Sequence, residues 1–455
     1  MHRHLHHLLL LLLLLLAPTT TSTTIKTSHI QYTTPTVTHS PDHSTVHIDL
    51  TFEGVPYQLT FYPNKELYSS NYQETINDGE LVFPEPLHHC HYHVSLGELP
   101  RHRHVHGAIT VCSDAPSGLI SFSGQLVALE PVFNLPLPVQ QQTSAKRRRT
   151  TDNKPHTHAL IKLSDMSHSL LTHFHSDIIR SASTVHQERR TPGRKLNAET
   201  KWVEMLVVND RRRFDAKGDQ TQKDSAAIVN AVNNLYDNAN FDPPIRVILV
   251  AQHTFTAVTD PWESKISDPA DVNVLINEFH EWRSGSVLSK VLPDHDNGHL
   301  FSSHDFNGAT VGYAGVGAMC LPASSGKWLK HRRVGLLVLS WFSFFYRVLM
   351  VVGVFIAYFV DGCFFFVVVP CCSLFYSIYS IYSGGIDQMT FAVAANAGIV
   401  AHEMGHNFDM SHDNNGCENS HVMSASLGAV APTTWSSCSA NYIQNFFATQ
   451  TLQLA

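Results

Sequence analysis

Residues 402–412 have the sequence His-Glu-Met-Gly-His-Asn-Phe-Asp-Met-Ser-His, and this run carries more functional information than any other part of the 455-residue chain. On a helix, His402 and His406 lie one turn apart on the same face, so both imidazoles can bind one metal ion. Glu403 lies beside them, where its carboxylate can take a proton from a metal-bound water. The polar residues that follow let the chain leave the helix and return His412 as a third ligand. Three protein nitrogens leave one tetrahedral position to water, as in a catalytic zinc site.

Two observations argue against a chance match. The chain has 31 histidines, so an H-E-x-x-H run could also be two helix histidines that are solvated or paired. However, His412 falls at the third-ligand position of the extended motif H-E-x-x-H-x-x-G-x-x-H. Residues 391–401, before the motif, are small and apolar, which is typical of a buried helix. We therefore predict a zinc hydrolase whose active-site helix spans about 391–408.

The motif and its flanks resemble the reprolysin (adamalysin) branch of the metzincins, the ADAM and ADAMTS proteases. The resemblance rests on the zinc motif, on Met423 in His-Val-Met-Ser-Ala, and on Trp435-Ser-Ser-Cys-Ser-Ala-Asn-Tyr. The other similar segments are the first catalytic strand at 201–210, the stretch before the active-site helix at 309–320, and the propeptide segments at 51–57 and 90–93.

The resemblance implies roles for the motif residues. His402, His406 and His412 would bind zinc, Glu403 would be the catalytic base, and Met423 would lie beneath the metal without binding it. The implied activity is hydrolysis of polypeptide substrates, namely extracellular-matrix or cell-surface proteins.

One residue departs from the family pattern. The family usually has glycine at position 409, where the backbone turns left-handed as it leaves the helix, and this chain has Asp409. Aspartate tolerates that conformation at a cost of about 1 kcal/mol, so the prediction of activity is kept.

Strand and helix patterns alternate after residue 200 and predict an α/β domain with a mostly parallel sheet and a cleft above the zinc. This domain is expected to cover 201–455, and short alternating strands in 46–135 predict a β-rich propeptide domain before it. The expected elements are strands at 203–208 and 245–251, helices at 222–239 and 270–284, and an edge strand at 298–303.

The N-terminal residues predict export from the cell. A cationic start leads into nine leucines, Leu8–Leu16, and then into small residues, which is the pattern of a signal peptide over 1–17. Nine leucines are far fewer than the roughly 20 apolar residues that span a bilayer, which disfavours a membrane anchor. Residues 18–45 are rich in Thr, Ser and His and are expected to be disordered. The net charge of −7 gives no basis for nucleic-acid binding.

Residues 136–200 are polar and contain basic clusters at 146–149 and 189–195. This composition predicts an exposed linker that a proprotein convertase cuts near Arg194, although a solvated run of charges fits equally well. No cysteine lies between Cys112 and residue 201, so the region offers no thiolate to cap the zinc. Latency would then come from the propeptide fold covering the cleft.

Eight cysteines in an exported chain should mostly pair. Cys90 and Cys112 fall together in the propeptide region and are expected to be partners, and the family pattern suggests a Cys417–Cys438 bond. The resemblance also assigns Glu204 and Asp296 to a structural calcium site, since carboxylates suit that hard cation. Glu204 could equally be an exposed strand residue.

Residues 327–384 interrupt the catalytic domain with long apolar runs at 334–360 and 363–382. Each run is long enough to span a membrane, yet the two ends of the insert must meet on a water-soluble fold. Joining residue 326 to Gly385 restores the sequence that the family usually has before the zinc helix. We therefore favour a retained intron or gene-model error over one or two transmembrane helices.

Two alternatives to an active secreted protease follow from this insert. The chain could be a secreted scaffold that keeps the zinc motif without turnover, or a membrane-inserted homologue whose protease resemblance is vestigial. Substrate specificity and oligomeric state have no signature in the sequence.

Overall fold

The computed structural model describes the chain in several stretches. These are residues 30–132, 158–162, 175–179, 199–319, 383–389 and 392–453, with short gaps at 43, 78–79, 83–89, 95–105, 113–114, 123–124, 258–259, 414–415, 419–420 and 426–433. The predicted signal peptide at 1–17 and nearly all of the apolar insert lie outside these residues.

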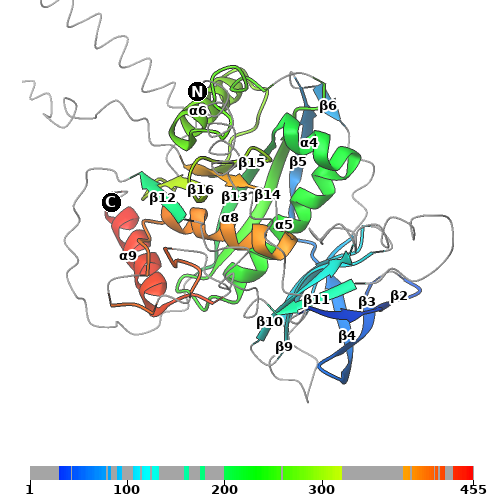
Figure 1. Cartoon of the computed structure of the whole chain (residues 1–455). Helices are drawn as coiled ribbons and strands as arrows, with labels where there is room; N and C mark the ends of the chain where they lie inside the picture. Colours follow the sequence, from blue (N-terminus) through cyan, green and yellow to red (C-terminus); the bar gives the residue numbers. More distant parts are fainter. Residues whose placement is uncertain are drawn as a thin grey trace, which may run out of the picture.

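A nine-stranded antiparallel sheet, built from strands before residue 163, forms the first body, which lies at the lower right of Figure 1. Its strands in spatial order are β1 (Ile30–Thr33), β11 (His158–Lys162), β10 (Gln125–Pro131), β9 (Ser117–Phe122), β8 (His106–Thr110), β7 (His91–His93), β4 (Val55–Pro63), β3 (Val46–Phe52) and β2 (Thr36–His39). Alternating apolar residues such as Val46, Ile48 and Leu50 on β3 form its separate core.

An eight-stranded sheet forms the second body. Its strands in spatial order are β12 (His175–Ile179), β16 (Thr310–Gly315), β17 (Gly384–Gln388), β15 (Asn297–Ser302), β13 (Lys201–Asn209), β14 (Ile245–Thr254), β5 (Tyr68–Ile76) and β6 (Glu80–Val82). The central strand β13 runs parallel to β14 and β15, while β16 runs antiparallel to its neighbour β17.

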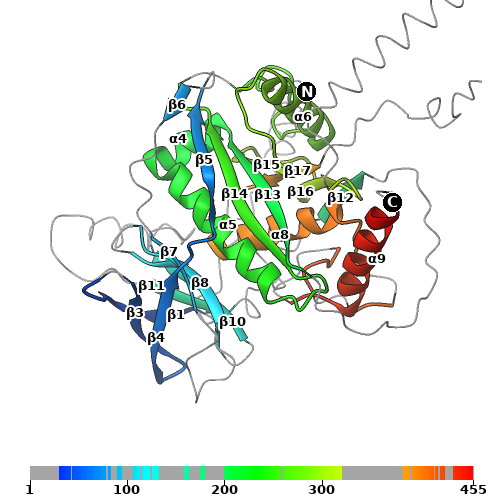
Figure 2. The ribbon, with the colours of Figure 1, turned by 180° about the vertical axis from the view of Figure 1, so that it is seen from behind.

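Helices cover both faces of this second sheet, and Figures 1 and 2 show them from opposite sides. The helices are α4 (Arg211–Lys217), the 3-10 turn η4 (Gly218–Gln220), α5 (Thr221–Asp237), α6 (Val272–Leu288), α8 (Val393–Asn407) and α9 (Ser437–Gln453). Met205 and Val207 of β13 share one core with α5 and α8, while Leu206 and Val208 share a second core with α6. Burial on both faces explains the continuous apolar run of this strand.

The helices predicted at 222–239 and 270–284 are confirmed as α5 and α6, within a few residues. The strand predicted at 298–303 is present as β15, but the prediction that it lies at the sheet edge is wrong. It pairs with β13 on one side and β17 on the other, and all six of its residues are buried. The sheet continues past β15 because β17 and β16 come from later in the chain.

Two predictions about irregular segments are also wrong in part. The region 18–45 was expected to be disordered, but Ile30–Thr33 and Thr36–His39 form β1 and β2. Their β-branched residues suit strands, and the partner strands β11 and β3 supply the hydrogen bonds. The region 136–200 was expected to be an exposed linker, but β11 is buried between β1 and β10 because His158-Ala-Leu-Ile-Lys carries a short apolar run.

Strands from before residue 201 also belong to the second sheet. β5 pairs parallel with β14, and β12 pairs parallel with β16 and forms the edge of the sheet. Asn230 of α5 contacts the first body, because its Nδ2 donates to the carbonyls of Tyr92 and Ile109, both at 3.3 Å. The amide of Asn64 donates to the Oδ1 of Asn230 at 2.8 Å. The two bodies are therefore joined by buried polar contacts, and the chain before residue 201 contributes strands to both sheets.

Candidate metal centre

The helix α8 carries the motif and is buried along its whole length. Its small residues, such as Ala397 and Gly398, allow close packing, and the Tyr236 hydroxyl of α5 donates to the carbonyl of Ala401 at 3.0 Å. At the C-terminal end of the helix, Asn407 Nδ2 donates to the carbonyls of Gly315 and Gly384, at 2.8 and 3.1 Å. The helix is thereby fixed between α5 and the strands β16 and β17.

Three imidazoles converge at the end of this helix. The Nε2 atom of His412 lies 3.2 Å from the Nε2 atoms of both His402 and His406. Ligands at zinc–nitrogen distances of about 2.0–2.1 Å in a tetrahedral site lie roughly 3.4 Å apart. The spacing of the three nitrogens therefore fits one small divalent ion at their centre.

Backbone carbonyls orient two of these rings. The Nδ1 atom of His402 lies 2.5 Å from the carbonyl oxygen of Val422, and that of His406 lies 2.8 Å from the carbonyl oxygen of Met410. An Nδ1–H that donates to a carbonyl leaves the lone pair on Nε2, which is the tautomer that binds metal. Burial lowers the pKa of His402 to about 3 and holds the pKa of His406 well below its usual value. Both rings are therefore neutral at physiological pH.

Glu403 directly follows His402 in the chain and is 1% exposed. The strand β16 passes directly over it. A Cβ atom on Gly312 would fall 2.7 Å from Cδ and 2.8 Å from Cγ of Glu403, so only glycine leaves room for this carboxylate. The position of Glu403 is therefore set by β16 as well as by α8.

Met423 packs against the zinc helix beside Gly405. It is completely buried, and a Cβ atom on Gly405 would fall 2.5 Å from its sulfur. Its carbonyl accepts a hydrogen bond from the backbone N–H of Asp413 at 2.8 Å. A disulfide joins Cys417 to Cys438, with a Cα–Cα distance of 6.3 Å, and links this turn to α9.

The turn after the helix contains Asp409 in the left-handed conformation, with φ of 67°. This is the conformation expected at that position. The N–H of Asp409 donates to the carbonyl of His406 at 2.9 Å, which closes the end of the helix.

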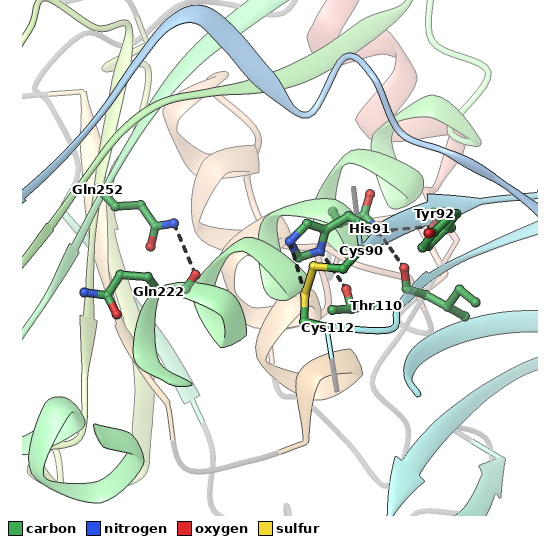
Figure 3. Close-up of a disulfide and its surroundings, with 9 residues drawn as sticks. Cys90, His91, Tyr92, Thr110, Cys112, Gln222 and Gln252 are labelled. Carbon is green, nitrogen blue, oxygen red and sulfur yellow. Dashed lines mark hydrogen bonds between the residues drawn. A yellow bond between two sulfur atoms is a disulfide. The ribbon is translucent and has the colours of Figure 1, made fainter. Parts of the chain in front are cut away.

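Cys90 and Cys112 form a second disulfide, in the first body, and Figure 3 places it beside His91. The Nδ1 atom of His91 lies 2.8 Å from the hydroxyl of Thr110, and burial lowers its pKa to about 3. Because both cysteines are bonded to each other, this group of donors cannot act as a thiolate metal site.

Glu204 and Asp296 lie side by side. The backbone N–H of Glu204 donates to Oδ2 of Asp296 at 3.0 Å, and burial together with the charges of Asp296 and Asp294 raises the pKa of Glu204. Among the described residues, none of the groups of three close donors includes either carboxylate. A calcium ion at this position stays a prediction.

Sequence patterns gave no signal for several parts of the centre. The carbonyls of Val422 and Met410 orient the ligands, but any residue can supply a carbonyl. Gly312 lies 91 positions before Glu403 in the chain, and only the pairing of β16 with β17 brings it there.

Comparison with known proteins identifies the family. The family described as Reprolysin (M12B) family zinc metalloprotease matches residues 201–341 and 371–453. The chain belongs to the reprolysin family. The matched segments contain the three histidines, Glu403 and Met423, and the gap between them lies inside the predicted insert. Reprolysins are zinc metalloproteases with a metzincin α/β fold. The reprolysin domain of this chain begins with β13, so it leaves out the strands β5, β6 and β12 of the second body.

Three relatives are similar over most of the chain. A zinc metalloproteinase-disintegrin-like protein of Cerberus rynchops is 24% identical over an aligned region that makes up 85% of this chain and 51% of the relative. Disintegrin and metalloproteinase domain-containing protein 12 of Mus musculus is 24% identical over 88% of the chain and 36% of its own length. The zinc metalloproteinase-disintegrin-like protein atragin of Naja atra is 26% identical over 62% of this chain and 43% of its own length. The chain thus spans about half or less of these relatives.

In the part of the chain that the structure describes, no helix is long and apolar enough to cross a membrane. The apolar runs at 334–360 and 363–382 lie outside that part. β17 begins at Gly384, which had been assigned to the insert, and Arg283 Nη1 donates to the carbonyl of Ser383 at 2.6 Å.

Proposed function

We propose that this reprolysin is a secreted zinc metalloendopeptidase that hydrolyses peptide bonds of extracellular or cell-surface proteins. The convergence of three Nε2 atoms beside the buried Glu403 carries the proposal. His402, His406 and His412 would hold the zinc ion. When bound, zinc supplies a Lewis acid that polarises a carbonyl and lowers the pKa of a water.

The protein side of the mechanism depends on Glu403. Its carboxylate accepts a proton from the attacking water and then donates that proton to the leaving amine. Because β16 and α8 enclose the side chain, the carboxylate is held in one position and needs little reorganisation during the reaction. The imidazole orientation is held in turn by the carbonyls of Val422 and Met410.

Without β12, β16 would be the edge of the sheet and the natural place for an extended substrate, since an exposed edge offers backbone hydrogen bonds to an added strand. In the full chain β12 already pairs there, with Asp177 opposite Tyr313 and Ile179 opposite Gly315. β12 precedes the basic cluster 189–195, so cleavage by a proprotein convertase near Arg194 would separate it from the reprolysin domain. This arrangement supports a propeptide in which residues before 201 block the substrate strand, and it needs no thiolate.

The test uses the full chain before and after cleavage at the basic cluster, with an unstructured protein as substrate. We expect chelator-sensitive cleavage only after processing. Glu403→Ala should retain zinc and lose at least about 100-fold in turnover, the usual size of a general-base contribution. If Glu403→Ala cleaved the substrate as fast as its parent, the proposal that Glu403 is the general base would be wrong.

The same assay separates an active protease from a non-catalytic homologue disrupted by the insert. A chain without residues 327–382 keeps Ser383 and all of β17, so it retains the contacts of Arg283. Activity only in this shortened chain would support the retained intron, and sequencing transcripts across codons 320–390 provides an independent check. A majority of reads that contain the insert would contradict it.

A further inference from the structure

A second group of side chains with metal-ligating atoms lies where three neighbouring parallel strands end. Asp210 directly follows β13, Asp260 lies in the loop after β14, and His304 lies two residues after β15. Because β13 runs parallel to both neighbours, the ends of the three strands meet at one edge of the sheet. One donor atom from each side chain lies within 4.8 Å of the others.

All three side chains are buried, with exposed fractions of 0% for Asp210, 3% for Asp260 and 0% for His304. The carboxylates have structural roles that leave lone pairs free. Asp210 accepts from the backbone N–H groups of Arg213 at 2.7 Å and Ser303 at 3.1 Å, and from the hydroxyl of Ser302. Asp260 accepts from the backbone N–H of Arg211, which lies 2.9 and 3.1 Å from its two oxygens. Each carboxylate has about four acceptor positions, so three donors to Asp210 and one to Asp260 do not exhaust either group.

His304 is the observation that points to a ligand. Neither of its ring nitrogens makes a hydrogen bond with any residue that the structure describes. Its Nε2 atom lies 3.9 Å from Oδ2 of Asp210 and 3.1 Å from Oε2 of Glu263. A buried imidazole without hydrogen bonds is costly, and the cost disappears if its lone pair binds a cation between these carboxylates.

The surrounding charge also favours a cation. Glu263 uses its other oxygen, Oε1, to pair with Arg212 at 3.1 Å, so Oε2 remains directed at His304. Arg212 in turn pairs with Asp268, and the cluster therefore holds more carboxylates than cationic groups. Carboxylates crowded in a buried site repel one another unless a positive charge lies between them.

We propose that Asp210, Asp260 and His304 bind a second divalent metal ion, with Glu263 as a further ligand at the outer edge. One imidazole among carboxylates favours a first-row transition metal such as Zn²⁺ or Mn²⁺ over Ca²⁺, which prefers oxygen ligands alone. The ion would tie the ends of β13, β14 and β15 to the start of α4. Its role is structural, and it is independent of the three-histidine centre and of peptidase activity.

The test counts metal ions on the full chain after dialysis against Zn²⁺, by elemental mass spectrometry. We expect two zinc ions per chain, and one in Asp260→Asn and in His304→Gln. Asp268→Asn is the matched control, because it removes a carboxylate that pairs with Arg212 but lies outside the donor group, and it should keep two. His406→Gln should lose the other ion, which distinguishes failure of this site from failure of the proposed catalytic centre.

A measurement on the unaltered protein avoids variants that fail to fold. Zn²⁺ binds nitrogen-rich sites more tightly than Mn²⁺, so Mn²⁺ added to protein with one zinc per chain should enter the second site. Pulsed electron paramagnetic resonance should then detect coupling to the nitrogen of a single imidazole. A wild-type chain that saturates at one ion, or bound Mn²⁺ without nitrogen coupling, would overturn the proposal and leave an ion-pair network around His304.

Discussion

The carboxyl group of Glu130, on β10 of the first body, faces the backbone N–H of Val393, the first residue of the zinc helix. The helix has no side-chain cap of its own, since its N-cap residue is Ala392. Glu130 is completely buried, and its neighbour Asp224 adds a like charge. A residue from before the reprolysin domain thus occupies the N-terminus of the helix that carries the metal ligands.

This contact predicts a pH dependence. Burial and the charge of Asp224 raise the pKa of Glu130 from 4.5 to about 8, so the folded state holds a proton that the unfolded chain releases. The stability contributed by this group is therefore fully present below pH 4.5, and it is lost as the pH rises toward 8. Glu130→Gln cannot ionise and should be more stable than the wild type at pH 8.5, by on the order of 5 kcal/mol at about 1.4 kcal/mol per pKa unit.

Urea unfolding of both proteins at pH 5 and pH 8.5 measures this difference. The two proteins should differ little at pH 5 and clearly at pH 8.5. Glu80→Gln, which changes an exposed glutamate on β6, controls for the loss of one charge. An equal effect of Glu130→Gln at both pH values would show that Glu130 does not hold a proton in the folded state.

Gly312 offers a way to displace the carboxylate of Glu403, which we propose as the catalytic base, without changing Glu403 itself. In Gly312→Ala the new methyl group overlaps Glu403 rather than the backbone of a neighbouring strand. We expect zinc to remain bound, since no histidine is contacted, and turnover to fall by about 100-fold or more. Gly285→Ala is the control, because a Cβ atom there meets nothing within 4 Å. Full activity in Gly312→Ala would mean that β16 moves to accommodate the methyl group.

The parts of the fold that were predictable from sequence depend on local periodicity. The spacing of His402 and His406 specifies a helix face, and the apolar pattern around Ile228 specifies the buried face of α5. The order of strands in a sheet depends on contacts between distant segments, which explains why β15 was placed at the edge and is internal. Glu130 had no local signal at all, because its role depends on how two bodies of the molecule pack.

Asn407 connects the end of the zinc helix to three strands. Besides its bonds to Gly315 and Gly384, its Oδ1 accepts from the Nδ2 of Asn297 on β15 at 2.6 Å. Asn407→Ala would leave these buried groups without partners and should destabilise the protein by about 2–4 kcal/mol. Asn407→Asp keeps the shape and the acceptor but loses both donated bonds, so it should also be destabilised. Thermal unfolding that is unchanged in Asn407→Ala would contradict a role in anchoring the helix.

Asp409 tests whether the departure from the family glycine weakens the metal centre. Its φ of 67° lies in the left-handed region, where β-branched residues are strained and glycine is not. Asp409→Gly relieves a small strain but gives the unfolded chain more freedom, so stability should change by less than about 1 kcal/mol. Asp409→Val should lose about 1–2 kcal/mol, and zinc affinity should fall with it because the turn positions His412. Calorimetric zinc titration of both variants measures this. Equal zinc affinity in the glycine and valine variants would mean that the turn does not determine where His412 lies.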